Sequence, residues 1–258
     1  MIIEARNLSF AYGATTVLQD VSLRLQPGVT AIIGPNAAGK STLLKCLAGL
    51  LHPTGSVWFD GKALDARQRH RLLGFLPQNL PTGQSMTVFE TVLLGLLPDL
   101  TWRVGSEELQ RVQAVLDDTR LAEVAERPLG RLSGGQLQMV LLAQAIVKAP
   151  TVLLLDEPTS YLDLRHQFEV LALLSRLTEK RGLVTVVALH DLGLAARFAR
   201  EICVLSAGRV HAVGPPTTVL TAAMLAAVYG VEATVVTGAE GRPWVIPAGL
   251  VPGQPTAE

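Results

Sequence analysis

The residues from Gly34 to Thr42 have the types and spacing of a phosphate-binding loop. They read Gly-Pro-Asn-Ala-Ala-Gly-Lys-Ser-Thr and fit the pattern G-x-x-x-x-G-K-[ST]. In such a loop, backbone N–H groups surround nucleotide phosphates, the lysine reaches the outer phosphates, and the serine hydroxyl binds Mg²⁺. We therefore expect a nucleoside triphosphate with Mg²⁺, held by Asn36, Ala37, Ala38, Gly39, Lys40, Ser41 and Thr42.

Two acidic residues, Asp156 and Glu157, follow the apolar run from Thr151 to Leu155. An unbroken apolar run of this length is typical of a strand buried on both faces of a parallel sheet. The carboxyl end of such a strand borders the crevice in which open α/β sheets bind ligands. We expect Asp156 to hold Mg²⁺ and Glu157 to polarise the water that attacks the γ-phosphate. Without the upstream loop, the same two acids could simply end a strand.

A second candidate phosphate site begins at Ser133, which is followed by Gly134, Gly135 and Gln136. The pattern predicts a helix over residues 136–148. A hydroxyl and bare backbone amides would then face outward at the positive end of that helix.

These motifs and their order resemble the nucleotide-binding subunits of ATP-binding-cassette (ABC) transporters, whose signature motif is LSGGQ. The resemblance covers about residues 1–235 and implies roles for further residues. Tyr12 matches the aromatic residue that stacks on adenine, and Val17 matches the apolar residue beside it. Because the chain has no N-K-x-D guanine reader, ATP is favoured.

The same resemblance implies roles for three further residues. Gln78 matches the glutamine that senses Mg²⁺ and the γ-phosphate, and Asp163 lies in the loop that crosses to a partner subunit. His190 matches the switch histidine, which contacts the γ-phosphate. A strand over residues 182–189 would deliver His190 to the same sheet edge as Asp156 and Glu157. Taken singly, Tyr12, Gln78 and His190 could each have a purely structural role.

Length and composition predict one α/β domain over residues 1–238. The resemblance implies a RecA-like P-loop NTPase core with an N-terminal antiparallel β layer (2–25 and 55–59) and an inserted helical subdomain at about 79–131. Within that subdomain we expect a helix over 87–95 and another that begins at Ser106. A capping box at Ser106 is matched only loosely, because Leu109 stands three residues later where the pattern has Asp or Glu. The tail over 239–258 is rich in Gly, Pro and Ala, which predicts partial disorder, with residues 253–258 the clearest case.

The bulk composition excludes several classes of protein. The chain has 258 residues, is 49% hydrophobic and 17% charged, and has a formal net charge of zero. No apolar run approaches the roughly twenty residues needed to span a bilayer. The N-terminus lacks a signal pattern, so we expect a cytosolic chain. The neutral charge balance gives no indication of nucleic-acid binding. Cys46 and Cys203 are expected to be small buried hydrophobes in a reducing compartment.

One phosphate loop and one signature in the chain imply two copies arranged head to tail, because ABC proteins sandwich each ATP between the loop of one subunit and the signature of another. The further implied partners are an integral membrane permease and, indirectly, a periplasmic or surface substrate-binding protein. The chain would then lie peripherally on the cytoplasmic face of the inner (plasma) membrane. Several runs resemble ATPases that serve iron-siderophore, haem and vitamin B12 importers: 76–81, 86–90, 162–170, 190–199 and 220–231.

Two other classes of function stay open at this point. One is a soluble ABC ATPase without a permease, for example in iron-sulfur cluster assembly. The other is a phosphate-binding module without turnover, which the presence of Glu157 and His190 opposes. Tyr161 stands in the crossing loop where relatives commonly have a small residue. Its effect on communication between the two ATP sites of the dimer is left open at this point.

Overall fold

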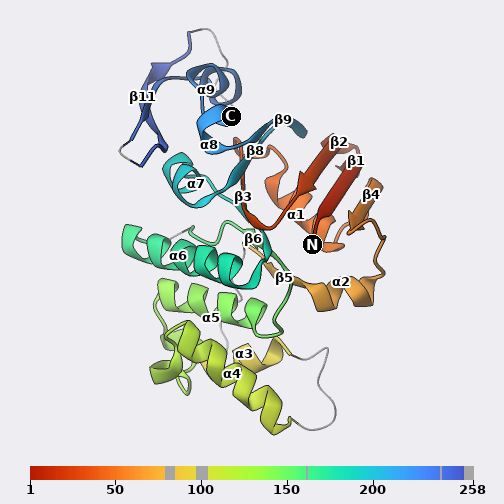
Figure 1. Cartoon of the computed structure of the whole chain (residues 1–258), viewed down its shortest axis with the longest axis vertical. Helices are drawn as coiled ribbons and strands as arrows, with labels where there is room; N and C mark the ends of the chain where they lie inside the picture. The colour runs from red at the N-terminus through yellow and green to blue at the C-terminus, as the bar shows by residue number, and fades with distance from the viewer. Residues whose placement is uncertain (79–84, 97–103, 161, 239, 253–258) are drawn as a thin grey trace.

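The computed structural model describes residues 1–78, 85–96, 104–160, 162–238 and 240–252. At its centre the described residues form a six-stranded sheet in the order β5-β6-β7-β3-β8-β9 (Figure 1). All neighbouring pairs in it are parallel except β8 and β9. The strands are β3 (Gly28–Ile33), β5 (Leu73–Leu76), β6 (Val152–Asp156), β7 (Val184–Ala188), β8 (Glu201–Ser206) and β9 (Arg209–Gly214).

The three middle strands, β3, β6 and β7, determine where the candidate site residues meet. Every residue of β6 and β7 is buried, as is every residue of β3 after Gly28. Parallel strands end at the same edge, so the chain following β3, β6 and β7 emerges there together. Helices α1 (Lys40–Ala48) and α6 (Leu164–Arg181) follow β3 and β6, and α7 (Leu192–Phe198) follows β7.

A second sheet covers one side of the core, as the N-terminal residues predicted. It is antiparallel and has the order β2-β1-β4, with β1 (Ile3–Tyr12), β2 (Thr15–Leu25) and β4 (Thr54–Phe59). Its inward residues, including Leu8 and Val21, join Leu43 and Leu47 of α1 in one apolar cluster. The predicted mixed α/β class with an antiparallel layer is confirmed.

The predicted inserted segment is helical where the structure describes it. It contains α3 (Val88–Leu94), α4 (Ser106–Asp118) and the short turns η2 (Ala122–Val124) and η3 (Leu129–Arg131), and α5 (Gly134–Ile146) follows. Figure 1 shows α3, α4 and α5 stacked at the end of the molecule away from α9 and β11. Residues 79–84 and 97–103 of this segment lie outside the described residues. The helix α2 (Ala66–Leu72) precedes β5.

The cap of α4 differs from the expected pairing of Ser106 with Leu109. The helix does begin at Ser106, but its cap residue is Gly105, whose N–H donates to Glu108 Oε2 at 2.9 Å. The expectation was wrong because Leu109 carries no acceptor, whereas the carboxylate of Glu108 reaches back to the free backbone donor.

The C-terminal region is more ordered than its composition predicted. After α8 (Pro216–Val219) and α9 (Ala222–Tyr229), β10 (Val231–Thr237) pairs antiparallel with β11 (Pro243–Leu250). The expected boundary at 238 therefore falls inside a hairpin. Arg242 Nη1 donates to Ala196 O at 2.8 Å, which attaches this hairpin to α7. Residues 253–258 lie outside the described residues.

Within the ranges that the structure describes, no helix combines the length and the apolarity needed to cross a bilayer.

Candidate functional site

The phosphate-binding loop connects β3 to α1, giving the strand, loop and helix that the motif requires. Gly34 and Gly39 have φ values of 154° and 100°, which disfavour a residue with a Cβ. A Cβ at Gly34 would also collide with the carbonyl oxygen of Leu205. No side chain caps the N-terminus of α1. Its first backbone amides are therefore suited to an anion.

The side chain of Lys40 folds back onto the phosphate-binding loop. Its ammonium donates to Gly34 O at 2.8 Å and Pro35 O at 2.9 Å, and the residue is buried. Burial lowers the pKa of Lys40, while the carboxylates of Glu157 and Asp156 oppose that shift. The ammonium can exchange these two carbonyls for phosphate oxygens without leaving the loop.

Ser41 and Asp156 form the candidate metal position. Ser41 Oγ donates to Asp156 Oδ1 at 2.8 Å, although the two residues lie 115 positions apart. Burial raises the pKa of Asp156, and the hydrogen bond from Ser41 opposes the rise. A buried carboxylate in this situation is stabilised by a cation. A hydroxyl and a carboxylate, completed by phosphate and water, fit the hard oxygen ligands that Mg²⁺ takes.

Glu157 is the centre of a hydrogen-bonded group at the sheet edge. Its Oε2 accepts from Gln78 Nε2 at 2.8 Å and from Ser160 Oγ at 3.0 Å, and its Oε1 contacts His190 Nε2. Gln78 follows β5, Glu157 follows β6 and His190 follows β7, as parallel strand order requires. Glu157 also has a φ of 52°, which is rare for a residue other than glycine. A carboxylate held from three sides can orient a water molecule and accept its proton.

The two residues expected near the nucleotide base occupy one β-hairpin. Tyr12 lies at the end of β1, is 49% exposed, and packs edge-to-face on Phe10 with ring centroids 4.9 Å apart. Val17 lies on β2, and its carbonyl oxygen would be 3.1 Å from a Cβ at Gly39. The hairpin therefore borders the phosphate loop, with the Tyr12 ring partly free for stacking.

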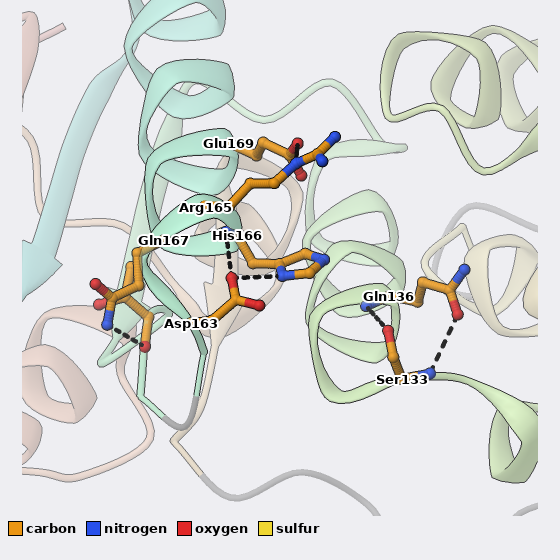
Figure 2. Close-up of polar contacts among 8 residues, drawn as sticks. Ser133, Gln136, Asp163, Arg165, His166, Gln167 and Glu169 are labelled. Atoms are coloured by element: carbon orange, nitrogen blue, oxygen red, sulfur yellow. Dashed lines mark hydrogen bonds and ion pairs between the residues drawn. The ribbon is translucent and has the colours of Figure 1, made fainter.

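The signature residues form the N-terminus of α5. Ser133 Oγ accepts from the N–H of Gln136 at 3.2 Å, and Gln136 Oε1 accepts from the N–H of Ser133 at 3.1 Å. This reciprocal cap confirms that Ser133 starts the helix, although the helix begins at Gly134 and ends at Ile146 rather than spanning 136–148. Figure 2 shows this cap beside the start of α6.

Asp163 caps α6 in a similar way. Its Oδ1 accepts from the N–H of His166 at 2.9 Å and lies 2.7 Å from His166 Nδ1 (Figure 2). The backbone donor, followed by the ring, lowers the pKa of Asp163. In the described part of the chain, the hydrogen bonds of Ser133, Gln136 and Asp163 stay within their own helix turns. The fold does not join them to Lys40 or Glu157. Tyr161, in the same crossing loop, is outside the described residues.

Comparison with known proteins decides the family. Residues 18–160 match the protein family described as ABC transporter. The chain belongs to the ABC transporter family.

Two relatives of this ABC protein are similar along nearly its whole length. It is 40% identical to the hemin import ATP-binding protein HmuV of Myxococcus xanthus, over 99% of this chain and 100% of the relative. It is 36% identical to the iron(3+)-hydroxamate import ATP-binding protein FhuC of Bacillus subtilis, over 91% and 90%.

Solved ABC structures show the same fold. A structure described as an inward-facing metal-chelate type ABC transporter aligns with a TM-score of 0.83 and 28% identity, covering 95% of this chain and 96% of that one. A dimeric bacterial ABC cassette aligns with a TM-score of 0.73 and 31% identity, covering 83% and 98%. The fold class is therefore a P-loop NTPase core, and this ABC protein is an ATP-binding subunit that hydrolyses ATP.

Sequence reasoning about this ABC ATPase missed two contacts. Ser160 hydrogen-bonds Glu157, and the ring of His166 lies against Gly135. A hydroxyl three residues after the expected catalytic acid was a weak signal for the first contact. The second joins segments far apart in the chain, and no local pattern marks it.

Proposed function

We propose that the chain is the ATP-hydrolysing subunit of an importer for an iron-siderophore or a related metal chelate, such as haem or vitamin B12. The curated relatives described above, with names that specify hemin and iron(3+)-hydroxamate import, support this class of cargo. The single observation that carries the catalytic part is Glu157, which Gln78, Ser160 and His190 hold at the edge next to Ser41 and Asp156.

The proposed division of roles follows from that geometry. Loop amides and Lys40 bind the phosphates, and Ser41 and Asp156 hold Mg²⁺ with Gln78 close by. When bound, Mg²⁺ neutralises charge on the β- and γ-phosphates. Glu157 orients the attacking water and accepts its proton, and His190 holds the Glu157 carboxylate and contacts the γ-phosphate. Tyr12 and Val17 receive the adenine.

The outward-facing signature and crossing loop support a second copy of the chain as the partner. Ser133, Gly134, Gly135 and Gln136 would cover the γ-phosphate bound by the other copy, and Asp163 would reach across the interface. The similar cassette that is dimeric supports this arrangement. Since ATP contacts both halves only when the dimer is closed, its binding favours closure, and hydrolysis favours reopening.

The closing and reopening of the dimer would drive an integral membrane permease, with a substrate-binding protein delivering the cargo to that permease. We place the permease contact on the helical lobe formed by α3 and α4, at the cytoplasmic face of the inner (plasma) membrane.

Reconstitution tests this proposal directly. The chain is co-expressed and co-purified with a candidate metal-chelate permease, and the complex is inserted into proteoliposomes. We expect ATP hydrolysis that rises when a substrate-binding protein loaded with ferric siderophore, haem or cobalamin is added. Hydrolysis by a chain that never co-purifies with a permease would instead favour the soluble class, such as a cluster-assembly ATPase.

A further inference from the structure

The two glycines of the signature have different surroundings. A Cβ at Gly134 would meet nothing within 4 Å, so that position faces open space. A Cβ at Gly135 would lie 2.5 Å from Cδ2 and 2.8 Å from Cγ of His166. Gly135 is not among the described residues with positive φ, so its backbone conformation does not require glycine. A Cβ at this position would instead force the His166 ring to shift.

His166 also contacts the crossing loop. Its Nδ1 lies 2.7 Å from Asp163 Oδ1, and its backbone N–H donates to the same oxygen at 2.9 Å. Since a carboxylate accepts hydrogen bonds, Nδ1 carries the proton in this pair. Figure 2 shows the ring extending from α6 toward the N-terminus of α5. One side chain therefore touches both segments that the proposed dimer would present to the second copy.

We propose that His166 is a positioning residue that fixes the crossing loop relative to the signature, so that both engage the second copy together. The inference rests on the proposed dimer mechanism. Asp163 is exposed, with 67% of its side chain accessible, and among the residues that the structure describes its side chain bonds to the first turn of α6 alone. With the ring present, a shift of α5 against ATP moves the Asp163 carboxylate as well. Without the ring, the two segments can move separately.

The first test is His166→Ala. Because His166 touches neither Lys40 nor Glu157, ATP affinity of the monomer should stay unchanged while kcat falls. Misplacement of groups remote from the chemistry by about 1 Å can cost up to ~100-fold, so we expect a loss of about 10-fold or more. His166→Asn should recover part of the loss, because its amide nitrogen can donate to Asp163 from the position of Nδ1. Glu169→Ala is the matched control on the same helix, where it breaks only the exposed pair with Arg165.

The second test uses Gly135→Ala in two backgrounds. In the wild-type chain the new methyl group collides with the His166 ring, so ATP-dependent dimerisation should fall. In the His166→Ala chain the ring is gone, so Gly135→Ala should reduce dimerisation less there than in the wild-type chain. Any loss common to both backgrounds comes from the proposed contact of Gly135 with the γ-phosphate. A general folding defect would not produce this dependence on background.

The outcomes separate the inference from the proposed function. Turnover and ATP-dependent dimerisation of His166→Ala at wild-type levels would overturn the positioning role, and so would equal damage by Gly135→Ala in both backgrounds. A wild-type chain that bound and hydrolysed ATP without dimerising would instead overturn the dimer mechanism itself.

Discussion

The phosphate-loop edge and the signature edge of this molecule are built in opposite ways. At the phosphate-loop edge, hydrogen bonds join residues 115, 79 and 33 positions apart. At the signature edge, the caps of α5 and α6 join residues three positions apart. Folding of a single chain therefore brings together the residues of the phosphate-loop edge. The signature edge consists of helix ends that are ordered by local hydrogen bonds. This contrast is what the proposed mechanism requires, in which the phosphate-loop edge carries the chemistry and a second copy completes the signature edge.

Removing the Glu157 carboxylate at the phosphate-loop edge should have the largest effect. Glu157→Gln keeps the shape of the side chain but removes the proton acceptor, so hydrolysis should fall by ~100-fold or more. ATP binding should persist, and the ATP-bound dimer should accumulate in light scattering. Glu169→Gln is a control of the same chemistry on α6. Turnover within about twofold of wild type would remove Glu157 from the catalytic role.

Two variants at the same edge should separate binding from chemistry. Lys40→Ala should abolish measurable nucleotide affinity, because the ammonium held by Gly34 and Pro35 is the cation placed in the loop. His190→Ala should keep affinity and lose turnover, because the ring contacts Glu157 rather than the loop. Titration with a fluorescent nucleotide measures both. Equal loss of affinity in the two variants would show that the histidine is assigned to the wrong step.

A mixed dimer tests whether the signature edge is completed by a second copy. Ser133→Arg places a bulky cation where phosphate must enter, so this chain should bind ATP as a monomer but fail to close. Combined with a Lys40→Ala chain, it forms one interface with both intact elements. We expect partial recovery of turnover and of ATP-dependent dimerisation. Normal dimerisation and hydrolysis by Ser133→Arg alone would exclude the signature from the active site.

The smallest expected effect is on the stability of the nucleotide-free chain. Asp156 has a pKa raised by burial, so the folded state binds its proton more tightly than the unfolded state does. Its contribution to stability is therefore best at acidic pH and falls as pH rises through the shifted pKa. Asp156→Asn should raise the Tm of the nucleotide-free chain at neutral pH and make its stability less dependent on pH. A lower Tm for the variant at neutral pH would contradict the assigned direction.

The sequence predicted the phosphate-loop edge better than any other part of the molecule. Lys40, Ser41 and Asp156 belong to patterns in which residue type and spacing are both constrained by phosphate and metal chemistry. The RecA-like core followed from the same patterns through resemblance. The roles of Tyr12, Gln78 and Asp163 came from resemblance alone, and they stay predictions.

Other features depend on contacts that no local pattern encodes. The β10–β11 hairpin is attached through Arg242 to the carbonyl of Ala196, 46 positions away, so its Gly- and Pro-rich composition was misleading. The fit of His166 against Gly135 joins two helices in space, and the LSGGQ motif alone does not say which glycine is fixed by a neighbour.

The left-handed backbone of Glu157 has a consequence for engineering. A non-glycine residue in that conformation costs about 1 kcal/mol or more of folding stability. Glycine at 157 would remove this cost and the proton acceptor together. Selection of variants for heat resistance alone would therefore favour loss of the proposed catalytic carboxylate, and a heat-stable form of this ATPase has to gain its stability away from the sheet edge.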